Sequence, residues 1–492
     1  MTSTSSKTQD MLSGRFADDL SCFELQFQRS SDIIIRRFKI TDVQQGAMIL
    51  LDGLSDIEAI NQSVLKPFFE YQNHALITSS GLSLPEIMTI LHDRLISNIQ
   101  LTISKERGYL MEQILSGDTV ILIEGVNQAL LLGSRKWNMR PVEEPATEAV
   151  IRGPREGFTE DLRTNTSLIR RRLKTLDLKM EAMKAGTESS TAVVITYLEN
   201  KVRVGLLEEI KARIQAVDSK VILDSGIIEN LIADNPVSVF PQMISTERPD
   251  KVVAGLSEGK AAILVDNSPF ALLLPVTFNE MLKASEDNYE HKIFAKIVQT
   301  LRFFMMISTL FLPSLYIAIT TFHQEMIPIT LLLSVASSRE AIPFPSFVEA
   351  LIMEVSFEAL REAGVRLPRP VGQAVSIVGA LIIGQAAVNA GIVSATMIII
   401  VSITGISSFI FPTFSQGIAI RLLRFPMMLF AATFGLYGIL MGCLCLLIHM
   451  CNLSSFGSPY LKPIISIKSG KLLQNSRSIW LQFRKLIADN RH

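Results

Sequence analysis

The sequence predicts an α/β domain of two similar subdomains, followed by an all-α polytopic membrane domain. Only 19% of the 492 residues are charged, against roughly 25% in soluble proteins, and the mean hydropathy is +0.33. The charge is also divided: residues 303–492 hold 13 basic and 7 acidic side chains, whereas residues 1–302 hold 34 and 40. Long charge-free runs occur in the second part alone, and the first part contains an internal repeat. The two parts are therefore different kinds of domain.

The first 30 residues are polar and have no apolar run of the kind found in signal peptides. Two α/β subdomains are expected after them, at residues 31–143 and 144–290. The repeat carries this prediction: TVILIEGVNQALLL from Thr119 resembles AAILVDNSPFALLL from Ala261, and each reads as a β-hairpin. Strand candidates lie upstream of each hairpin, at Ala47–Leu51 and Ala192–Leu198, and so do two helix-rich stretches, Ser83–Ser116 and Ser225–Glu247. Chance similarity between two apolar hairpins is the alternative.

Residues 291–452 form the predicted membrane domain. A span needs about 20 apolar residues, and residues 303–322 contain no formal charge. Residues 371–411 are long enough for two spans, with a turn at Asn389-Ala390-Gly391, and the last span is expected from Pro426 to about Met450. Residues 326–363 hold a re-entrant or amphipathic segment, so four or five spans are possible.

The basic tail, residues 453–492, is expected on the cytoplasmic side because positively charged flanks stay there. With four spans, both termini lie on that side, and the α/β domain is then cytoplasmic. Arg361, Arg366 and Arg369 would lie outside under this count, which is why five spans stay open.

A row of carboxylates is the first candidate site. Glu354, Glu358 and Glu362 recur every four residues and share one face of a helix that begins near Ser346. In a ring of identical subunits they would form stacked acidic rings, which select cations. An amphipathic helix at the membrane surface with a solvated acidic face explains the pattern equally well.

Two further groups of polar residues are candidates. Gln385 and Asn389 lie one helical turn apart in the membrane, where they could line an ion path or bond a neighbouring helix. Basic residues that could contact a partner or lipid headgroups are Arg170, Arg171 and Arg172, at the end of a predicted helix, and Arg421 and Arg424, before the last span. For the first three, a solvated helix face is the simpler interpretation.

Several functions are excluded or disfavoured. A neutral total charge argues against nucleic-acid binding, and the sequence has no nucleophile motif, phosphate loop or metal-protease motif, so no enzyme activity and no cofactor are expected. The four cysteines lack partners at zinc-ligand spacing and read as packing residues.

The chain also resembles a known family, the A subunits of GerA-type nutrient germinant receptors of endospore-forming bacteria. The resemblance extends from about Asp32 to Pro463 and is specific because its motifs stand in order. They are GPREGFTEDLRTNTSLIRRRL from Gly153, DNPVSVFPQ from Asp234, TERPDKV from Thr246, SREAIPFP from Ser338, EALREAGVRLP from Glu358, IVGALIIGQAAV from Ile377 and SFGSPYLKP from Ser455. Asn267 stands where the family pattern has glycine, which asparagine can replace in a turn.

The resemblance implies a receptor subunit in the spore inner membrane, with its N-terminal domain on the spore-core side. It implies a transporter-like B subunit and a lipoprotein C subunit as partners, and homo-oligomers of the membrane domain that form a nutrient-gated cation channel. A secondary transporter with broken helices and a membrane scaffold that relays a signal are the alternatives.

Overall fold

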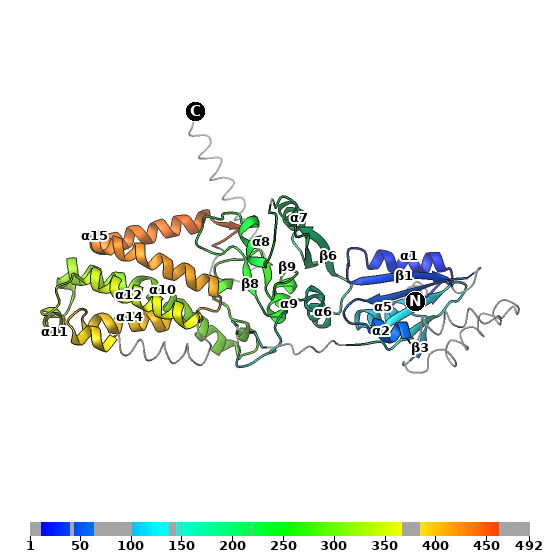
Figure 1. Cartoon of the computed structure of the whole chain (residues 1–492), viewed down its shortest axis with the longest axis horizontal. Coiled ribbons are helices and arrows are strands. Elements are labelled where there is room, and N and C mark those ends of the chain that lie inside the picture. The colour runs from blue at the N-terminus through cyan, green and yellow to red at the C-terminus, as the bar shows by residue number, and fades with distance from the viewer. Residues whose placement is uncertain are drawn as a thin grey trace, which may run out of the picture.

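The structure is a computed structural model in which an α/β part is followed by a helical part (Figure 1). It describes residues 11–39, 44–62, 101–136, 144–145, 147–148, 150–217, 219–366 and 384–461. Most of the stretch between 63 and 100, the segment 367–383 and the basic tail beyond 461 lie outside these residues. The helix predicted between Ser83 and Ser116 can therefore be compared only from residue 101 onwards.

The first subdomain is a five-stranded antiparallel sheet with helices packed on it. Its strands are β1 (Ile33–Lys39), β2 (Gln45–Leu51), β3 (Leu101–Ser104), β4 (Thr119–Ile123) and β5 (Ala129–Leu132), in the order β1-β2-β4-β5-β3. Its helices are α1 (Phe16–Gln26), α2 (Ile57–Ile60) and α5 (Arg107–Leu115). One face of the sheet packs on α1 and α5 through Phe23, Ile49 and Ile114.

The second subdomain repeats this sheet topology. Its strands are β6 (Leu178–Ala185), β7 (Thr191–Leu198), β8 (Ile244–Thr246), β9 (Ala261–Val265) and β10 (Ala271–Leu274), in the order β6-β7-β9-β10-β8. Its helices are α6 (Leu162–Arg172), α7 (Leu206–Gln215), α8 (Ser225–Ile232) and α9 (Pro249–Ser257), and two 3₁₀ turns follow, η3 (Glu280–Leu282) and η4 (Ser285–Asn288). The two sheets thus have equivalent strand orders.

The repeated sequences form the equivalent hairpins, β4–β5 and β9–β10. Ile121 pairs with Leu130 in the first hairpin and Ile263 with Leu272 in the second. The turn residues Gly125 and Asn267 both have left-handed backbones, with φ of +80° and +64°. Asparagine tolerates this conformation better than most residues, so the hairpin keeps its turn without glycine. The strands predicted at Ala47–Leu51 and Ala192–Leu198 are confirmed as β2 and β7.

A buried ion pair joins the two subdomains. Arg170, in the last turn of α6, donates from Nε and Nη2 to the two carboxylate oxygens of Asp32, at 2.9 and 3.1 Å. Its remaining nitrogen donates to the carbonyl of Leu178 at 3.0 Å. Both side chains of the ion pair are almost fully buried. Because every nitrogen of this guanidinium has an acceptor, the contact fixes the orientation of one subdomain on the other.

The helical part contains α10 (Lys292–Phe322), the 3₁₀ turn η5 (Gln324–Met326), α11 (Ile329–Arg339), α12 (Ser346–Arg366), α14 (Ala395–Ser407) and α15 (Phe414–Asn452). Within the described part of the chain, two helices are long and apolar enough to cross a membrane, α10 and α15. The turn expected at Asn389-Ala390-Gly391 is present, with Gly391 at φ +64°.

The last span is not the single pass expected from Pro426 to Met450. Gly435 interrupts α15 with φ +59° and ψ −138°, and the chain reverses there, as the two orange arms show (Figure 1). A Cβ on Gly442 would lie 2.4 Å from the sulfur of Met427, which only a folded-back helix brings so close. Hydropathy cannot detect this reversal, since residues 425–448 carry no formal charge on either side of Gly435.

The end of α15 returns to the second subdomain, and residues 454–460 dock on it. We name these residues the clasp; they contain the two-residue strands β11 (Ser454–Ser455) and β12 (Ser458–Pro459). The Ser455 hydroxyl donates to the carbonyl of Gln242 at 2.6 Å, and the amide of Phe278 donates to the carbonyl of Tyr460 at 3.0 Å. The first residues of the predicted basic tail are therefore a folded part of the α/β core.

Candidate functional site

The polar face of α12 points into the protein. Ser346, Glu349, Ala350, Met353 and Glu354 are buried, at the spacing of one helix face. The predicted apolar face is on the other side, where Ile352 and Val355 are 36% and 52% exposed. A helix with its carboxylates inside and its apolar residues outside suits a lipid environment or a subunit interface, not a solvated surface.

Glu354 forms a fully buried ion pair with Arg424 of α15. The Nη1 of Arg424 lies 2.8 Å from Oε2 of Glu354, and the two side chains are 1% and 0% exposed. The Thr404 hydroxyl of α14 donates to Oε1 of the same carboxylate at 3.3 Å. The N–H groups of Arg424 are not aligned on the oxygens, so charge attraction, not a bidentate hydrogen bond, holds this pair.

Glu358, one turn further along α12, is shared by three arginines. Nη1 of Arg421 lies 2.9 Å from it, Nη2 of Arg424 3.6 Å and Nη1 of Arg361 3.7 Å. The guanidinium of Arg361 also donates to the Ser408 hydroxyl. We call Glu354, Glu358, Arg361, Arg421 and Arg424 the ion-pair cluster; it joins α12 to the first arm of α15.

These contacts change the interpretation of five sequence candidates. Arg424 is not a headgroup anchor, because its side chain is buried inside the helical part, and Arg421 is 13% exposed and paired with Glu358. Glu354 and Glu358 do not form a free acidic stripe, because each faces an arginine of its own chain. Glu362 alone of the three is exposed.

A second ion pair lies at the opposite end of α12. Arg339, the last residue of α11, reaches Glu349 at 3.1 Å, and Glu349 is 0% exposed. The backbone amide of Ser394, before α14, donates to the other oxygen of Glu349 at 2.9 Å. This pair was not predicted from the sequence. It could have been expected, because a charge inside an apolar segment usually has a partner.

Gln385 and Asn389 lie on the outer surface of the helical part. Both side chains are exposed, on the helical residues 384–389, and they are one turn apart. Exposed amides among apolar helices are costly in lipid unless water or a neighbouring protein meets them. Of the sequence candidates in this part, these two are placed where another subunit or a water-filled path could reach them.

The basic residues of α6 make contacts within the α/β part. Arg170 is buried in the ion pair with Asp32, so it is not a surface for headgroups or a partner. Arg171 and Arg172 both pair with Glu156, in the linker before α6. Arg171 and Arg172 are partly exposed, and a contact with a partner remains a proposal for these two alone.

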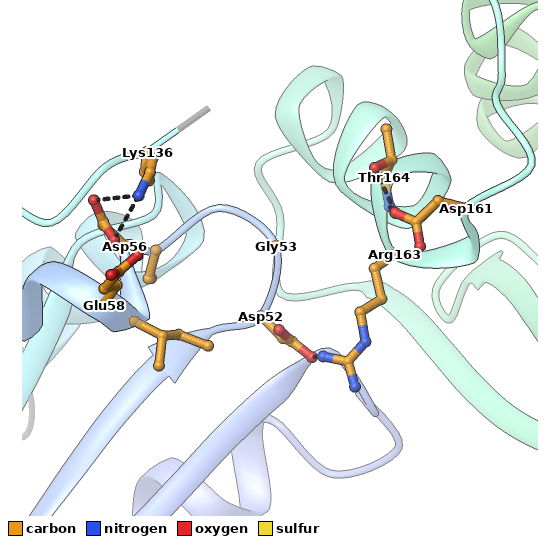
Figure 2. A pocket seen from close by; sticks show the side chains of 10 residues that line it. Asp52, Gly53, Asp56, Glu58, Lys136, Asp161, Arg163 and Thr164 are labelled. Atoms are coloured by element: carbon orange, nitrogen blue, oxygen red, sulfur yellow. Dashed lines mark hydrogen bonds and ion pairs between the residues drawn. The ribbon is translucent and has the colours of Figure 1, made fainter. Parts of the chain in front are cut away.

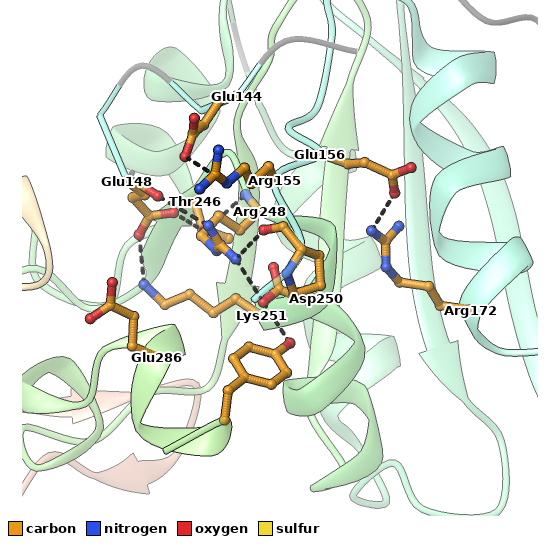
Figure 3. Close-up of polar contacts among 12 residues, drawn as sticks. Glu144, Glu148, Arg155, Glu156, Arg172, Thr246, Arg248, Asp250, Lys251 and Glu286 are labelled. Atoms are coloured by element: carbon orange, nitrogen blue, oxygen red, sulfur yellow. Dashed lines mark hydrogen bonds and ion pairs between the residues drawn. The ribbon is translucent and has the colours of Figure 1, made fainter. Parts of the chain in front are cut away.

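The TERPDKV motif holds the linker between the subdomains (Figure 3). Arg248 is 1% exposed and donates to the carbonyls of Pro154 and Glu148 at 2.8 and 3.1 Å, and to Asp250 at 3.0 Å. The hydroxyl of Tyr289 also donates to Asp250, at 2.8 Å. Burial, followed by this hydrogen bond, raises the pKa of Tyr289 to about 12, so it stays a donor. The motif is a structural joint between the linker, α9 and η4.

A polar cleft of about 290 Å³ opens between the subdomains (Figure 2). On one side are Asp52, Asp56 and Lys136, and on the other Asp161 and Arg163 of the α6 N-terminus. Lys136 pairs with Asp56 at 3.0 Å, and Arg163 pairs with Asp52 across the cleft. Asp161 accepts from the amide of Thr164 at 2.8 Å as the helix N-cap. Lys136 and Asp56 thus pair with each other, as do Arg163 and Asp52, and Asp161 caps α6.

An α/β domain joined to helices that are apolar enough to cross a membrane is the arrangement of a membrane-associated protein. The chain belongs to the Bacillus/Clostridium GerA spore germination protein family, whose model matches residues 21–485. The family consists of germinant receptor subunits that are not enzymes. The resemblance found in the sequence motifs and the expected lack of enzyme activity are both confirmed.

Individual relatives cover most of the chain. YfkQ, an uncharacterized membrane protein of Bacillus subtilis (strain 168), is 44% identical over 462 residues, which are 93% of this chain and 87% of that protein. Spore germination protein KA of the same strain is 40% identical over 93% of this chain and 83% of its own length. A crystal structure of the N-terminal domain of the A subunit of the Bacillus megaterium spore germinant receptor GerK3 is also similar. It covers 55% of this chain and 97% of that domain, at 27% identity and a TM-score of 0.42.

Proposed function

We propose that this protein is the membrane subunit of a nutrient germinant receptor that initiates spore germination, and that it acts as an oligomeric, nutrient-gated cation channel. Membership of the GerA family supports the role in germination. The two candidate spans support a place in the membrane, and the membrane that we propose is the spore inner membrane. Its proposed partners are a transporter-like B subunit and a lipoprotein C subunit.

The observation that carries the channel proposal is the exposed amide pair. Gln385 and Asn389 are exposed one turn apart, whereas Glu354 and Glu358 are engaged within the chain. In a ring of subunits, the amides would face the neighbouring subunit or the central path and exchange hydrogen bonds with water and cations. The ion-pair cluster then has a different task, which is to hold α12 and α15 in one arrangement.

The two ends of the helical part support the proposed orientation. The helical part begins at Lys292, just after η4, and ends at the clasp, which docks on the second subdomain. Both ends are therefore on the side of the α/β domain. With the α/β domain on the spore-core side, nutrients arriving from outside would first meet α11 and the opposite end of the bundle.

The experiment that tests the channel is ion flux from vesicles that contain the complete receptor. We expect nutrient to trigger cation efflux, and Gln385→Leu with Asn389→Leu to reduce it at least tenfold, because the path loses its polar lining. Thr433→Val is the matched control: Thr433 is also exposed, but its hydroxyl already donates to the carbonyl of Leu429 at 3.1 Å. That variant should conduct normally.

The outcome also separates the rival functions. A secondary transporter would give slow, saturable flux of nutrient itself, and a scaffold would give no flux at all. Unchanged efflux in the double leucine variant would remove the amide pair from the ion path. The transporter alternative has one structural feature in its favour, the interruption of α15 at Gly435, since broken helices bind substrates in such proteins.

A further inference from the structure

The loop that contains DNPVSVFPQ has a rigid backbone. The amide of Asn235 donates to Oε1 of Gln242 at 2.8 Å, and Nε2 of Gln242 donates to the carbonyl of Asn235 at 2.6 Å. The amide of Ser238 donates to the carbonyl of Asn235 at 3.2 Å, closing a β-turn over Pro236 and Val237. Asparagine and proline at the first two positions are the residues such a turn prefers. The turn is therefore formed before anything binds to it.

This loop is fixed to the last turn of α15. The Ser238 hydroxyl lies 2.9 Å from Nε2 of His449. The ring of Phe240, which is 2% exposed, stacks on the ring of His449 at 5.9 Å. The Ser454 hydroxyl donates to Asp234 at 2.7 Å. In Figure 1, α8 and β8, which flank the loop, lie beside this end of α15.

The tip of the loop is apolar and exposed. Val237 is 89% exposed and Val239 37%, while the polar residues around them bond inside the loop. The second arm of α15, whose His449 holds the loop, presents Leu444, Leu447 and Ile448 to the surface, 57%, 49% and 54% exposed. The exposed tip is thus fixed to a candidate span that itself carries exposed apolar residues.

The tip of the loop lies at the height where the charge-free part of α10 begins, which is where a membrane surface is expected. Arg302, the last charge before the charge-free residues 303–322, donates to the carbonyl of Leu282 at 3.4 Å, and the neighbouring Met281 contacts the hydroxyl of Tyr460 at 3.4 Å. The ring of Tyr460 lies 6.2 Å from the ring of Phe240, which stacks on His449. His449 therefore lies close to where the apolar part of α10 begins. A rigid loop held at this level presents its tip to the headgroup region, where apolar side chains gain from contact with acyl chains.

We propose that Val237 and Val239 insert into the leaflet on the α/β side, as a membrane-contact loop that sets the α/β domain against the lipid surface. The proposal deepens the proposed function and rests on its membrane placement. The occupant is lipid, because the loop is held by His449 of α15, a candidate span with exposed apolar residues.

Spin labels in the full-length chain test the proposal, in vesicles of phosphatidylglycerol and phosphatidylethanolamine. Cys22, Cys443, Cys445 and Cys451 are first replaced by serine, and a nitroxide is placed by Val237→Cys. Leu25→Cys is the aqueous control, since Leu25 is 69% exposed and belongs to α1, which lies at the end of the molecule opposite the helical part (Figure 1). Leu444→Cys is the lipid control. We expect the ratio of collisions with oxygen to collisions with a water-soluble nickel chelate to be severalfold higher at residue 237 than at residue 25.

Each other result has a distinct meaning. A label at residue 237 that behaves like residue 25, while residue 444 reports lipid, overturns the membrane-contact loop and leaves the proposed function standing. A label at residue 444 that is also aqueous overturns the membrane placement and the loop together. Protection of residue 237 from both oxygen and chelate means that a protein covers the tip, which overturns lipid as the occupant.

A second variant avoids the cysteine replacements. Val237→Trp, in the otherwise unchanged chain, should be quenched by brominated phospholipid more strongly than Leu25→Trp. Equal quenching in these two variants would contradict the proposal even if the serine background fails to fold.

Discussion

Glu354 and Arg424 form a buried ion pair in which each charge is compensated by the other. Neither side chain is exposed to solvent beyond 1%, and each is the nearest opposite charge of the other. Removing one member of such a pair leaves an uncompensated charge, which costs more than the pair itself contributes. The pair therefore restricts α12 and α15 to arrangements in which the two residues meet.

Glu354→Gln is expected to destabilise the protein by roughly 3–5 kcal/mol, because the buried guanidinium of Arg424 loses its nearest carboxylate and keeps only Glu358, at 3.6 Å and shared with two other arginines. Thermal unfolding of the detergent-solubilised full chain measures this loss. Glu354→Gln combined with Arg424→Met should recover most of the stability, since no buried charge is then left alone. Glu362→Gln, at an exposed carboxylate of the same helix, is the control and should change stability by less than about 1 kcal/mol. A double variant as unstable as the single one would contradict this account.

The sequence predicted the shared face of Glu354 and Glu358 but not their partners. Helical spacing relates residues within one helix, and Arg421 and Arg424 lie on another helix more than 60 positions away. The same limit applies to Arg170: its place at the end of α6 suggested a solvated cation, and only the packing of β1 on α6 brings Asp32 to it. The spacing of residues along a helix predicts which of them share a face, but it does not predict which face is buried.

At the scale of an element, α8 carries a carboxylate with an unusual pKa. Burial, with a smaller effect from Asp224, raises the pKa of Glu229 to about 7. The folded state holds this proton more tightly than the unfolded state, so stability falls as the pH rises from about 4.5 to about 7. The cost is complete above that range and absent below it.

Glu229→Gln removes this cost, because the amide cannot ionise. The variant should be more stable than the natural chain at pH 8, by an amount on the order of 2 kcal/mol, and equally stable near pH 4.5. Unfolding curves recorded across this pH range give the comparison. Glu208→Gln, at an exposed position of α7, should leave the curve unaltered, and a pH-independent gain at position 229 would show that ionisation is not the cause.

The reversal of α15 depends on Gly435. Its backbone, at φ +59° and ψ −138°, is a conformation that other residues adopt only with strain, and a Cβ would come within 2.8 Å of His323. Gly435→Ala should therefore destabilise the helical part by about 2 kcal/mol or more. Gly384→Ala is the matched control, because among the described residues its Cβ would meet only Ile398, at 3.8 Å. Equal melting temperatures for the two variants would show that the reversal does not need glycine.

Elements were predicted best where several independent sequence patterns agreed. The hairpins β4–β5 and β9–β10 were found because alternation, turn residues and repetition all indicated them. The chain reversal at Gly435 was missed because a charge-free run reports apolarity and not direction. The edge strand β8 was missed within a stretch predicted as helix-rich, since its three residues are too few for a recognisable period.

At the scale of the whole molecule, the clasp couples the helical part to the second subdomain. Tyr460 is fully buried between the rings of Phe240 and Phe278, at 6.2 and 6.1 Å. Arg203 of the α/β domain donates to the Ser458 hydroxyl at 2.8 Å and to the carbonyl of Phe456. A movement of α15 would therefore be felt directly by the α/β domain.

Tyr460→Ala should cost about 3–5 kcal/mol through the cavity that it leaves. It should also make the segment after α15 accessible to protease before the rest of the chain unfolds. Tyr460→Phe keeps the ring and loses only a 3.4 Å contact with the sulfur of Met281, so it should behave like the natural chain. Limited proteolysis with mass spectrometry distinguishes the two, and resistance of the alanine variant would show that the clasp is held by its backbone alone.

The clasp has a consequence for the order of synthesis. Phe456 and Tyr460 complete the two apolar clusters on either side of the second sheet, yet they follow α15 in the chain. While the ribosome is still making the helical part, these two positions in the packing of the sheet are unfilled. The α/β domain, although translated first, therefore reaches its final packing only when α15 has been made and its end has come back to the second subdomain. The second sheet therefore completes its apolar packing only after the helical part has been synthesised.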